Sequence, residues 1–424
     1  MKDKYNPFFY EYGINNIKLN KIYSNNIDNN NCNNNNICNN NYLNIIRNNL
    51  MEKGNLNKKI LNNINYNTKE NKNLNITIIN KDKNSDKLIN LNDNFMQYIS
   101  HLPIPLVDYL CTSRGISEIK KKLPQSNYEY KKILILYLNK NGLTKIMKNV
   151  YGNYFFQQLI KDSEEHIISL ILFYISDNFI DISKDSSGTF SLQALLDEIS
   201  TLENEIKILK FIKHHEMEIA YDKNATYVLQ KLLLIIPDTR RKELNEIILN
   251  NIKELCLDSN GICLIKNFIR TNTLINDKKR INDEFVKNFL LLAESPFGNY
   301  GIQYLIENWD NDILNDLKDK IMENIHKLSI QQYSSNVVEK AIEIIDGEFR
   351  TKIIQKLCFE GHLMTLIKNK FGRFVLYKAI NYMNNGLKNE LEKEIINIIN
   401  NKIYNNKDKN KLKKFFVKIK HRQM

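Results

Sequence analysis

A small residue recurs along this chain at a nearly constant interval, and this period limits the possible folds more than any other feature. The small residues are Gly115, Gly152, Gly188, Ala225, Gly261, Gly298, Ser334 and Gly372, separated by 37, 36, 37, 36, 37, 36 and 38 residues. Six of the 13 glycines fall on these positions, so chance is a poor explanation. Because a period of about 20 to 50 residues is typical of stacked repeats, the sequence predicts a solenoid of eight units.

The content of each unit predicts helices. An apolar helix comes first, such as residues 130–140; a shorter apolar stretch leads to the small residue, and a second long helix follows. With only 13 Gly and 6 Pro in 424 residues, turn-forming residues are too few for a many-stranded β fold. We therefore expect an all-α, curved α-solenoid.

The second long helix has a polar side and an apolar side. Counted from the residue after the small one, positions 0, +1 and +4 are usually polar or aromatic, whereas +2, +3, +6 and +7 are usually apolar. At about 100° per residue these two sets occupy opposite arcs of a helix. Stacked helices would therefore present a column of polar trios, and this column is the candidate site.

The trios share an amide at +4 and an aromatic ring at +1 in several units. They are Asn153/Tyr154/Gln157, Thr189/Phe190/Gln193, Thr226/Tyr227/Gln230, Ile262/Cys263/Lys266, Asn299/Tyr300/Gln303, Ser335/Asn336/Glu339 and Arg373/Phe374/Tyr377, after a weaker Ile116/Ser117/Lys120. A ring can cover the face of an unstacked base while an amide pairs with its edge. Guanine presents two adjacent donors, which suit a carboxylate such as Glu339.

The strings GNYFFQ, GNYGIQYLIE and YSSNVVEKAIE closely resemble repeats of the PUF (Pumilio) RNA-binding proteins. The resemblance covers about residues 92–424 and implies eight three-helix repeats to about residue 384, with a C-terminal cap at 385–424. It implies that each repeat binds one base of single-stranded RNA and that the C-terminal repeats hold the 5′ end. It also implies a code: Asn with Gln for uracil, Ser with Glu for guanine, and a small residue with Gln usually for adenine. The expected target is 5′-N-G-U-N-A-A-U-N-3′.

Two units depart from the family pattern. The eighth has Arg373 and Tyr377 where reading the first uracil of a UGU element would need Asn and Gln. The fifth has Ile262, Cys263 and Lys266, so base preference there is lost or Lys266 contacts a phosphate.

The remaining features bear on class and location. Residues 1–91 are rich in asparagine and lack a stable period, which predicts a mostly disordered segment. The net charge of +13 favours an anionic partner. The longest apolar run, residues 167–175, is half the length of a membrane span, and the start of the chain has no signal-peptide core. These features predict a soluble, intracellular protein with no membrane partner.

From the resemblance we expect a monomeric, cytoplasmic protein that binds messenger RNA 3′ untranslated regions at a UGU-like element. It would regulate translation or decay, with repression or deadenylation factors as partners. Two alternatives stay open: a nucleolar PUF-like protein in ribosome assembly, and a HEAT-like or armadillo-like scaffold that binds protein. We expect no enzyme activity, cofactor or metal site; the segment HHEME at 214–218 lacks the second histidine of a zinc motif.

Overall fold

The computed structural model describes residues 97–122, 128–345, 347–400 and 405–421, and all regular secondary structure in these ranges is helical. The prediction of an all-α fold is therefore confirmed. Contacts divide the chain into Met1–Ile89 and Asn90–Met424, and every described residue belongs to the second part. The Asn-rich segment 1–91, predicted to be disordered, lies outside the described residues.

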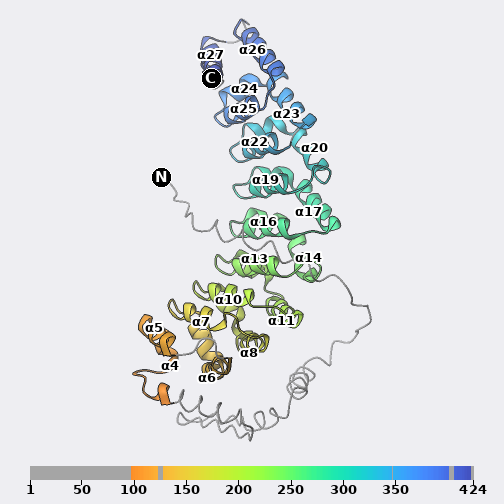
Figure 1. The fold of residues 1–424 in the computed structure, drawn as a ribbon. Coiled ribbons are helices and arrows are strands. Elements are labelled where there is room, and N and C mark those ends of the chain that lie inside the picture. Colours follow the sequence, from red (N-terminus) through yellow and green to blue (C-terminus); the bar gives the residue numbers. More distant parts are fainter. Residues whose placement is uncertain (1–96, 123–127, 346, 401–404, 422–424) are drawn as a thin grey trace. The chain divides into compact units, whose positions relative to one another are not determined.

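The helices follow one another in a repeated order of long, short and long (Figure 1). The first helices of the units are α6 (Tyr128–Met147), α8 (Glu165–Ile175), α11 (Leu202–Ile212), α14 (Lys242–Asn250), α17 (Ile275–Lys287), α20 (Asn315–Glu323) and α23 (Gly347–Phe359). The short middle helices are α4 (Leu106–Leu110), α9 (Phe179–Lys184), α12 (Glu216–Tyr221), α15 (Ile252–Leu257), α18 (Phe289–Ala293), α21 (Ile325–Ser329) and α24 (Leu363–Lys368). In the second unit α6 contains both, separated at Asn139, whose φ is 49°.

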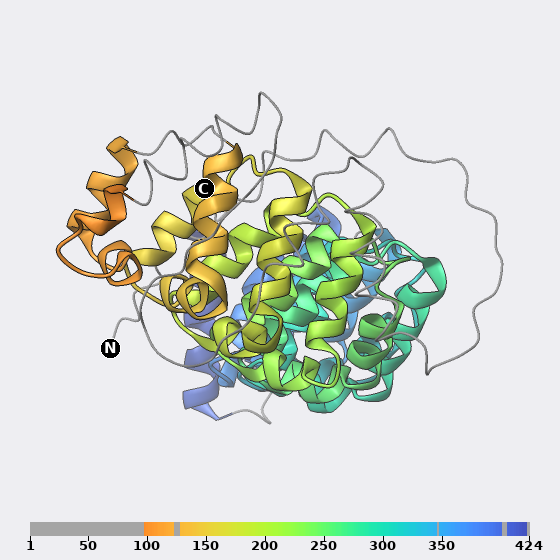
Figure 2. The same cartoon turned by 90° about the horizontal axis from the view of Figure 1, so that it is seen from below.

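The third helix of each unit contains the polar trio. These helices are α5 (Ser113–Lys122), α7 (Gly152–Ile160), α10 (Gly188–Asp197), α13 (Thr226–Ile235), α16 (Gly261–Thr271), α19 (Gly298–Asn308), α22 (Ser334–Ile344) and α25 (Gly372–Asn381). From α7 to α25 each one packs against the next in chain order, and Figure 2 shows the units one behind another. This stacking of third helices confirms the α-solenoid and gathers the trios in one row.

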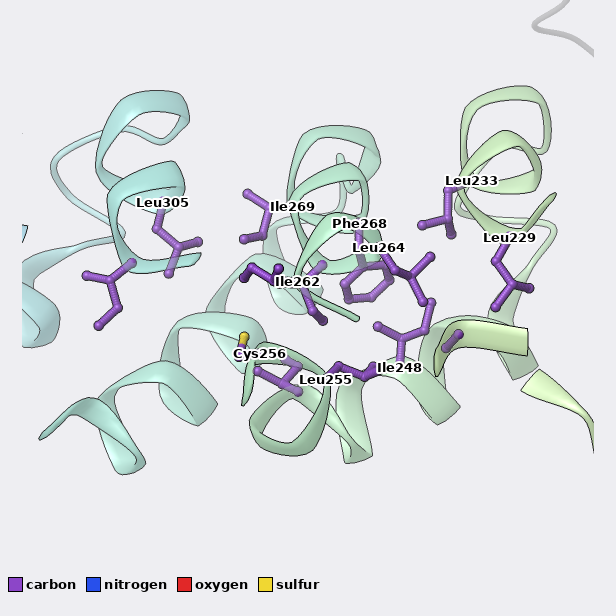
Figure 3. Packing of buried hydrophobic residues seen from close by; sticks show 14 of the residues in the cluster. Leu229, Leu233, Ile248, Leu255, Cys256, Ile262, Leu264, Phe268, Ile269 and Leu305 are labelled. Atoms are coloured by element: carbon purple, nitrogen blue, oxygen red, sulfur yellow. The ribbon is translucent and has the colours of Figure 1, made fainter. Parts of the chain in front are cut away.

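Buried apolar side chains join neighbouring units into one core. Figure 3 shows part of this core around the fifth unit, with buried residues from α13, α14, α15, α16 and α19: Leu229, Leu233, Ile248, Leu255, Cys256, Ile262, Leu264, Phe268, Ile269 and Leu305. Full burial of one such large side chain stabilises by about 1.5–3 kcal/mol. Since these side chains come from adjacent units, a repeat depends on its neighbours for its stability.

The most apolar segment of the solenoid lies in this core. Residues Glu165–Lys184 are long and apolar enough for a membrane span by length and composition. In the structure they form α8, the short 3-10 helix η2 (Ser176–Asn178) and α9, and Ile167, Ile171 and Ile175 are completely buried. The segment is thus accounted for as the core of the third unit.

The small residue of each unit allows a close helix approach. A Cβ atom built on Gly152 would lie 2.6 Å from the carbonyl oxygen of Ile146, at the end of α6. Ser334 occupies the same place in the seventh unit, and its hydroxyl donates to the carbonyl oxygen of Leu328 at 2.9 Å. The period found in the sequence therefore marks the contact between the middle and third helices.

Two helices follow the last unit, α26 (Asn385–Asn400) and α27 (Asn406–His421). Helix α27 packs against both α26 and α24, and Lys368 Nζ lies 2.5 Å from a carboxylate oxygen of Asp408. These contacts place α27 over the end of the stack.

Candidate nucleic-acid interface

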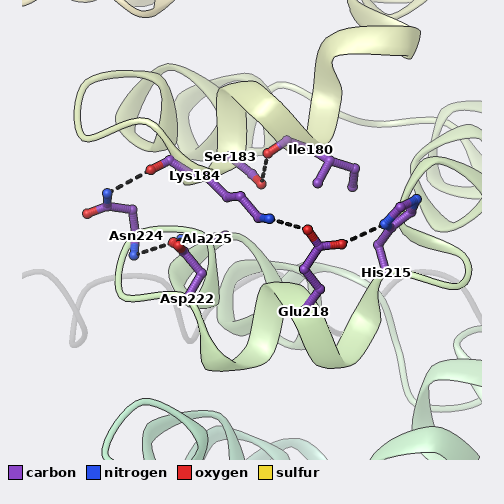
Figure 4. Close-up of polar contacts among 8 residues, drawn as sticks. All are labelled: Ile180, Ser183, Lys184, His215, Glu218, Asp222, Asn224 and Ala225. Carbon is purple, nitrogen blue, oxygen red and sulfur yellow. Dashed lines mark hydrogen bonds and ion pairs between the residues drawn. The ribbon is translucent and has the colours of Figure 1, made fainter.

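One side chain, three residues before the small residue, fixes the start of each third helix. In the fourth unit Asp222 Oδ1 accepts hydrogen bonds from the backbone N–H groups of Asn224 and Ala225, both at 2.8 Å (Figure 4). The same pair of bonds is made by Asn149, Asp185, Asp258, Ser295, Gln331 and Asn369 in other units. These oxygens satisfy N–H groups that a helix start leaves without partners. Each trio is thereby held in the same register.

Position 0 of the trio is buried in the four units that have Gln at position +4, which are the second, third, fourth and sixth, and in the seventh unit. Asn299 is 1% exposed, and its Nδ2 donates to the carbonyl oxygens of Ser295 at 2.8 Å and Pro296 at 3.2 Å. Asn153 Nδ2 donates to the equivalent carbonyls of the second unit. Because both N–H groups are used, the side-chain oxygen is the part of each Asn that faces its trio partner. An Asn that donates to a base carbonyl would first have to exchange one of these bonds.

Position +1 is exposed. The exposed fractions are 61% for Tyr154, 52% for Phe190, 43% for Tyr227, 48% for Tyr300 and 61% for Phe374. Cys263 and Asn336 occupy this position in the fifth and seventh units and are exposed too. Because these aromatic rings are exposed and not packed in the core, they are available to stack on a ligand.

Position +4 is half-buried and hydrogen-bonded to position 0. Gln303 Nε2 donates to Asn299 Oδ1 at 2.8 Å, and Gln157 Nε2 donates to Asn153 Oδ1 at 3.1 Å. In the third and fourth units the acceptor is a threonine hydroxyl, at 3.3 Å in both. Each Gln therefore keeps one N–H available, and each except Gln230, whose Oε1 accepts from Asn267, also keeps its carbonyl oxygen. Such an amide can pair with one base edge.

Glu339 takes the +4 place in the seventh unit. Burial raises the pKa of its carboxyl, and the nearby charge of Lys378 partly opposes this shift. Lys378 Nζ pairs with Glu343 at 3.1 Å, and within the described residues the Glu339 carboxylate has no ion-pair partner of its own. A half-buried carboxylate without a salt bridge can accept from two donors of a ligand.

The fifth and eighth units differ in structure as well as in sequence. Ile262 is buried, and Lys266 Nζ lies 5.4 Å from the centre of the Tyr304 ring, a cation–π distance. The Tyr377 ring packs on Phe415 of α27, with ring centroids 5.2 Å apart. The +4 side chains of these units are therefore engaged by protein neighbours.

The spacing of the units suits unstacked bases. Packed helices lie about 8–10 Å apart, more than twice the rise of about 3.4 Å per base in a stacked strand. One base per unit would thus leave room for a side chain between successive bases.

The histidine-rich segment does not form a metal site. His215 Nδ1 lies 2.8 Å from Glu218, whose other carboxylate oxygen pairs with Lys184 of the preceding unit (Figure 4). Among the residues that the structure describes, no group of three or more His, Cys, Asp or Glu side chains could hold a metal ion.

Fold and site together define an α-solenoid of three-helix repeats that presents one polar and aromatic trio per unit. The model of the Pumilio-family RNA binding repeat matches residues 144–173, 215–244, 324–358 and 362–396. Four stretches of the solenoid therefore match the Pumilio-family repeat, which confirms the resemblance found in the sequence.

Two relatives with Pumilio in their names match this chain over about half of its length. Pumilio homolog 12 of Arabidopsis thaliana is 28% identical over 241 residues, which are 56% of this chain and 40% of that protein. A Pumilio domain-containing protein of Schizosaccharomyces pombe is 24% identical over 238 residues, covering 56% of this chain and 35% of the relative. The match thus spans less than half the length of these relatives.

Two solved structures have the same fold. The Puf4 RNA binding domain, bound to a 3′ UTR recognition sequence of HO endonuclease RNA, superposes with a TM-score of 0.63 at 20% identity, covering 72% of this chain and 97% of that one. PUF-8 in complex with PBE-RNA gives 0.62 at 19% identity, covering 78% and 100%.

Proposed function

We propose that this chain binds single-stranded RNA sequence-specifically, with one base per repeat along the row of third helices. The observation that carries the proposal is the geometry shared by the four Gln trios: position 0 is buried, position +1 is exposed and position +4 is a half-buried amide aligned by position 0. A protein-binding groove has no need to repeat one hydrogen-bonding pair per unit.

The base assignments follow the trios. Asn299 with Gln303 and Asn153 with Gln157 each leave an amide for uracil, whereas Ser335 with Glu339 leaves a carboxylate for the two donors of guanine. Thr226 with Gln230 and Thr189 with Gln193 favour adenine. With the C-terminal units at the 5′ end, the target is 5′-N-G-U-N-A-A-U-N-3′.

Stacking on the exposed rings supplies much of the affinity. One base on one aromatic ring contributes about 1–3 kcal/mol. Several lysines of the third helices are paired with acidic residues of the preceding unit: Lys340 with Glu307, Lys378 with Glu343 and Lys231 with Asp197. Paired lysines attract phosphates less, so we expect recognition to depend more on bases than on backbone charge.

The transcripts bound by solved neighbours support a role in messenger RNA regulation. Several of these structures, including Puf3 with Cox17 RNA, contain 3′ UTR recognition sequences. We extend this to the present chain: a monomeric, cytoplasmic protein without enzyme activity that binds 3′ untranslated regions at a UGU-like element and controls translation or decay through recruited factors. Localisation of a tagged protein tests the cytoplasmic assignment, since a nucleolar signal would favour ribosome assembly instead.

Selection of bound sequences from a random RNA pool tests the proposal. Enrichment of GU, then one free base, then AAU supports both the code and the polarity. A pool that stays random after repeated selection contradicts sequence-specific binding.

A further inference from the structure

The side chain at position +5 of one third helix reaches the +4 side chain of the preceding unit. Asn267 Nδ2 donates to Gln230 Oε1 at 2.8 Å, linking α16 to α13. Tyr304 stands in the same relation to Lys266, and Lys378 acts in the same way on Glu339 through its charge. Residues of a second column, outside the trios, therefore contact the +4 side chain of the preceding unit or act on it through their charge.

The orientation of the Asn267 amide is fixed by its own partners. Its Oδ1 accepts from Arg270 Nη2 at 2.6 Å, and its Nδ2 also donates to the carbonyl oxygen of Cys263 at 3.2 Å. A guanidinium can only donate and a carbonyl can only accept, so turning this amide over would lose both bonds. Asn267 must therefore present an N–H to Gln230.

Gln230 is aligned in turn. With its Oε1 facing Asn267, its Nε2 donates to Thr226 Oγ1 at 3.3 Å. If the Gln230 amide turned over, its NH2 group would face that of Asn267, with no acceptor between them. The neighbouring unit thus selects one of the two orientations of this amide.

The other Gln units obtain the same orientation without a side chain from position +5 of the next unit: the second and sixth from their own repeat, and the third with the help of a backbone carbonyl of the fourth. In the second and sixth units the acceptor is an Asn Oδ1, whose Nδ2 is anchored on backbone carbonyls. In the third unit the Thr189 hydroxyl gives its proton to the carbonyl oxygen of Asn224 at 2.9 Å and can only accept from Gln193. For Thr226, no such donation is found among the described residues, and a free hydroxyl can accept from an amide or donate to it.

We propose that Asn267 is a specificity-positioning residue for the fourth unit: it fixes the Gln230 amide so that this unit distinguishes bases by the order of donor and acceptor on their edge. The proposal rests on the proposed function. A fixed amide presents its donor and acceptor to a base edge in one order, and in this unit that order is combined with Thr226, whereas the uracil-assigned units combine the same orientation with an Asn. Without Asn267 the amide can adopt both orientations and read either base.

Two substitutions in the full chain test this positioning role. Asn267→Ala removes the donor, and we expect the ratio of affinities for adenine over uracil at the fifth base to fall about fivefold or more, toward unity. Asn267→Asp replaces the donor with an acceptor of the same shape, which should draw the Gln230 NH2 toward it and lower this ratio at least as far as Asn267→Ala does. The repulsion between the added charge and the RNA phosphates is the same for both RNAs, so it cancels in the ratio.

The controls separate this inference from the proposed function. Asn308→Asp changes an exposed Asn of α19 that bonds only its own helix, at Tyr304 O, and should leave all ratios unchanged. The ratio at the sixth base, read by Thr189 and Gln193, should stay constant in every variant. If wild type selects bases at other positions and both Asn267 variants keep the wild-type ratio at the fifth, the positioning role is wrong although RNA binding stands.

A readout without RNA completes the test. In NMR spectra of the free protein, the side-chain NH2 signals of Gln230 should shift with Asn267→Asp and not with Asn308→Asp. Unchanged Gln230 signals would overturn the inference even if the chain proved not to bind RNA.

Discussion

Gln303 Nε2 donates to Asn299 Oδ1 at 2.8 Å, and this bond joins a half-buried amide to a buried one within one turn of α19. Since Asn299 is itself anchored on two backbone carbonyls, the Gln303 amide is oriented before any ligand arrives. Affinity gained by such preorganisation comes from a smaller loss of side-chain freedom on binding.

The seventh unit should change its base preference when its trio is changed to that of the sixth. The double substitution Ser335→Asn with Glu339→Gln replaces a carboxylate acceptor with an amide held by an Asn oxygen. We expect the second base to change from G to U, a shift of about 1–3 kcal/mol in relative binding, with other positions unchanged. RNA selection on the double variant measures this. Continued recovery of G would refute the assignment of Glu339.

Removing the exposed ring of the sixth unit should weaken binding without changing selectivity. Tyr300→Ala should cost about 1–3 kcal/mol of binding free energy, because the ring stacks on a base face that all bases share. Tyr300→Phe keeps the ring and is the matched control. Tyr300 is 48% exposed, so thermal unfolding should be little affected by either change. Equal affinities of the Ala and Phe variants would exclude stacking by Tyr300.

Guanine preference should be lost on acidification sooner than an ordinary glutamate would allow. Burial raises the pKa of Glu339 in the free protein, so its carboxylate becomes protonated at a pH above the usual value of about 4.3. The protonated group no longer accepts from both guanine donors. The ratio of G to U binding at the second base, titrated from pH 7 downward, should fall, whereas the ratio at the third base should not. A flat profile at both positions would rule out a titrating Glu339.

The sign of the stability effect follows from the same shift. A raised pKa in the folded state means that Glu339 favours folding when protonated and that this contribution is lost as the pH rises through the folded-state pKa. Glu339→Gln should therefore raise the unfolding midpoint at neutral pH relative to wild type, and this gain should shrink toward lower pH.

The side chain three residues before each small residue should contribute to the stability of the fold. Asp222→Ala leaves the N–H groups of Asn224 and Ala225 without their acceptor and should destabilise the fold by about 0.5–2 kcal/mol. Asp222→Asn retains the side-chain oxygen and should cost less. Denaturant unfolding of the two variants measures the difference, and equal destabilisation would show that the oxygen does not hold this helix start.

Periodic features of the fold could be predicted from the sequence because the repeat multiplies a weak local signal. The small residues at 36- to 38-residue spacing and the apolar positions +2, +3, +6 and +7 indicate stacked helices without any knowledge of contacts. The side chains that hold the starts of the third helices also recur in the sequence, as an Asp, Asn, Ser or Gln three residues before most small residues.

Burial of position 0 follows from helix geometry, although the polarity of this position suggests exposure. At about 100° per residue, position +7 lies within about 20° of position 0 on the helix circumference, so Asn153 and Asn299 border the apolar arc. Their side chains satisfy carbonyls at the helix start and face inward, although their polarity predicted an exposed position.

Contacts between units could not be read from a single helical period. The bond from Asn267 to Gln230, the position of Lys266 on Tyr304 and the packing of Tyr377 on Phe415 each join residues 37 or 38 positions apart. Such pairs depend on how adjacent helices are rotated and shifted, which the sequence of one unit does not specify.

The most direct test of the account is a comparison of two short RNAs that differ only at the guanine-uracil step. Binding of the full chain to an RNA containing 5′-GUNAAU-3′ should be about tenfold or more tighter than to the same RNA with both bases replaced by cytosine, since two edge-reading contacts are lost. Equal affinities, measured side by side at one salt concentration, would contradict base reading by the seventh and sixth units and with it the central claim.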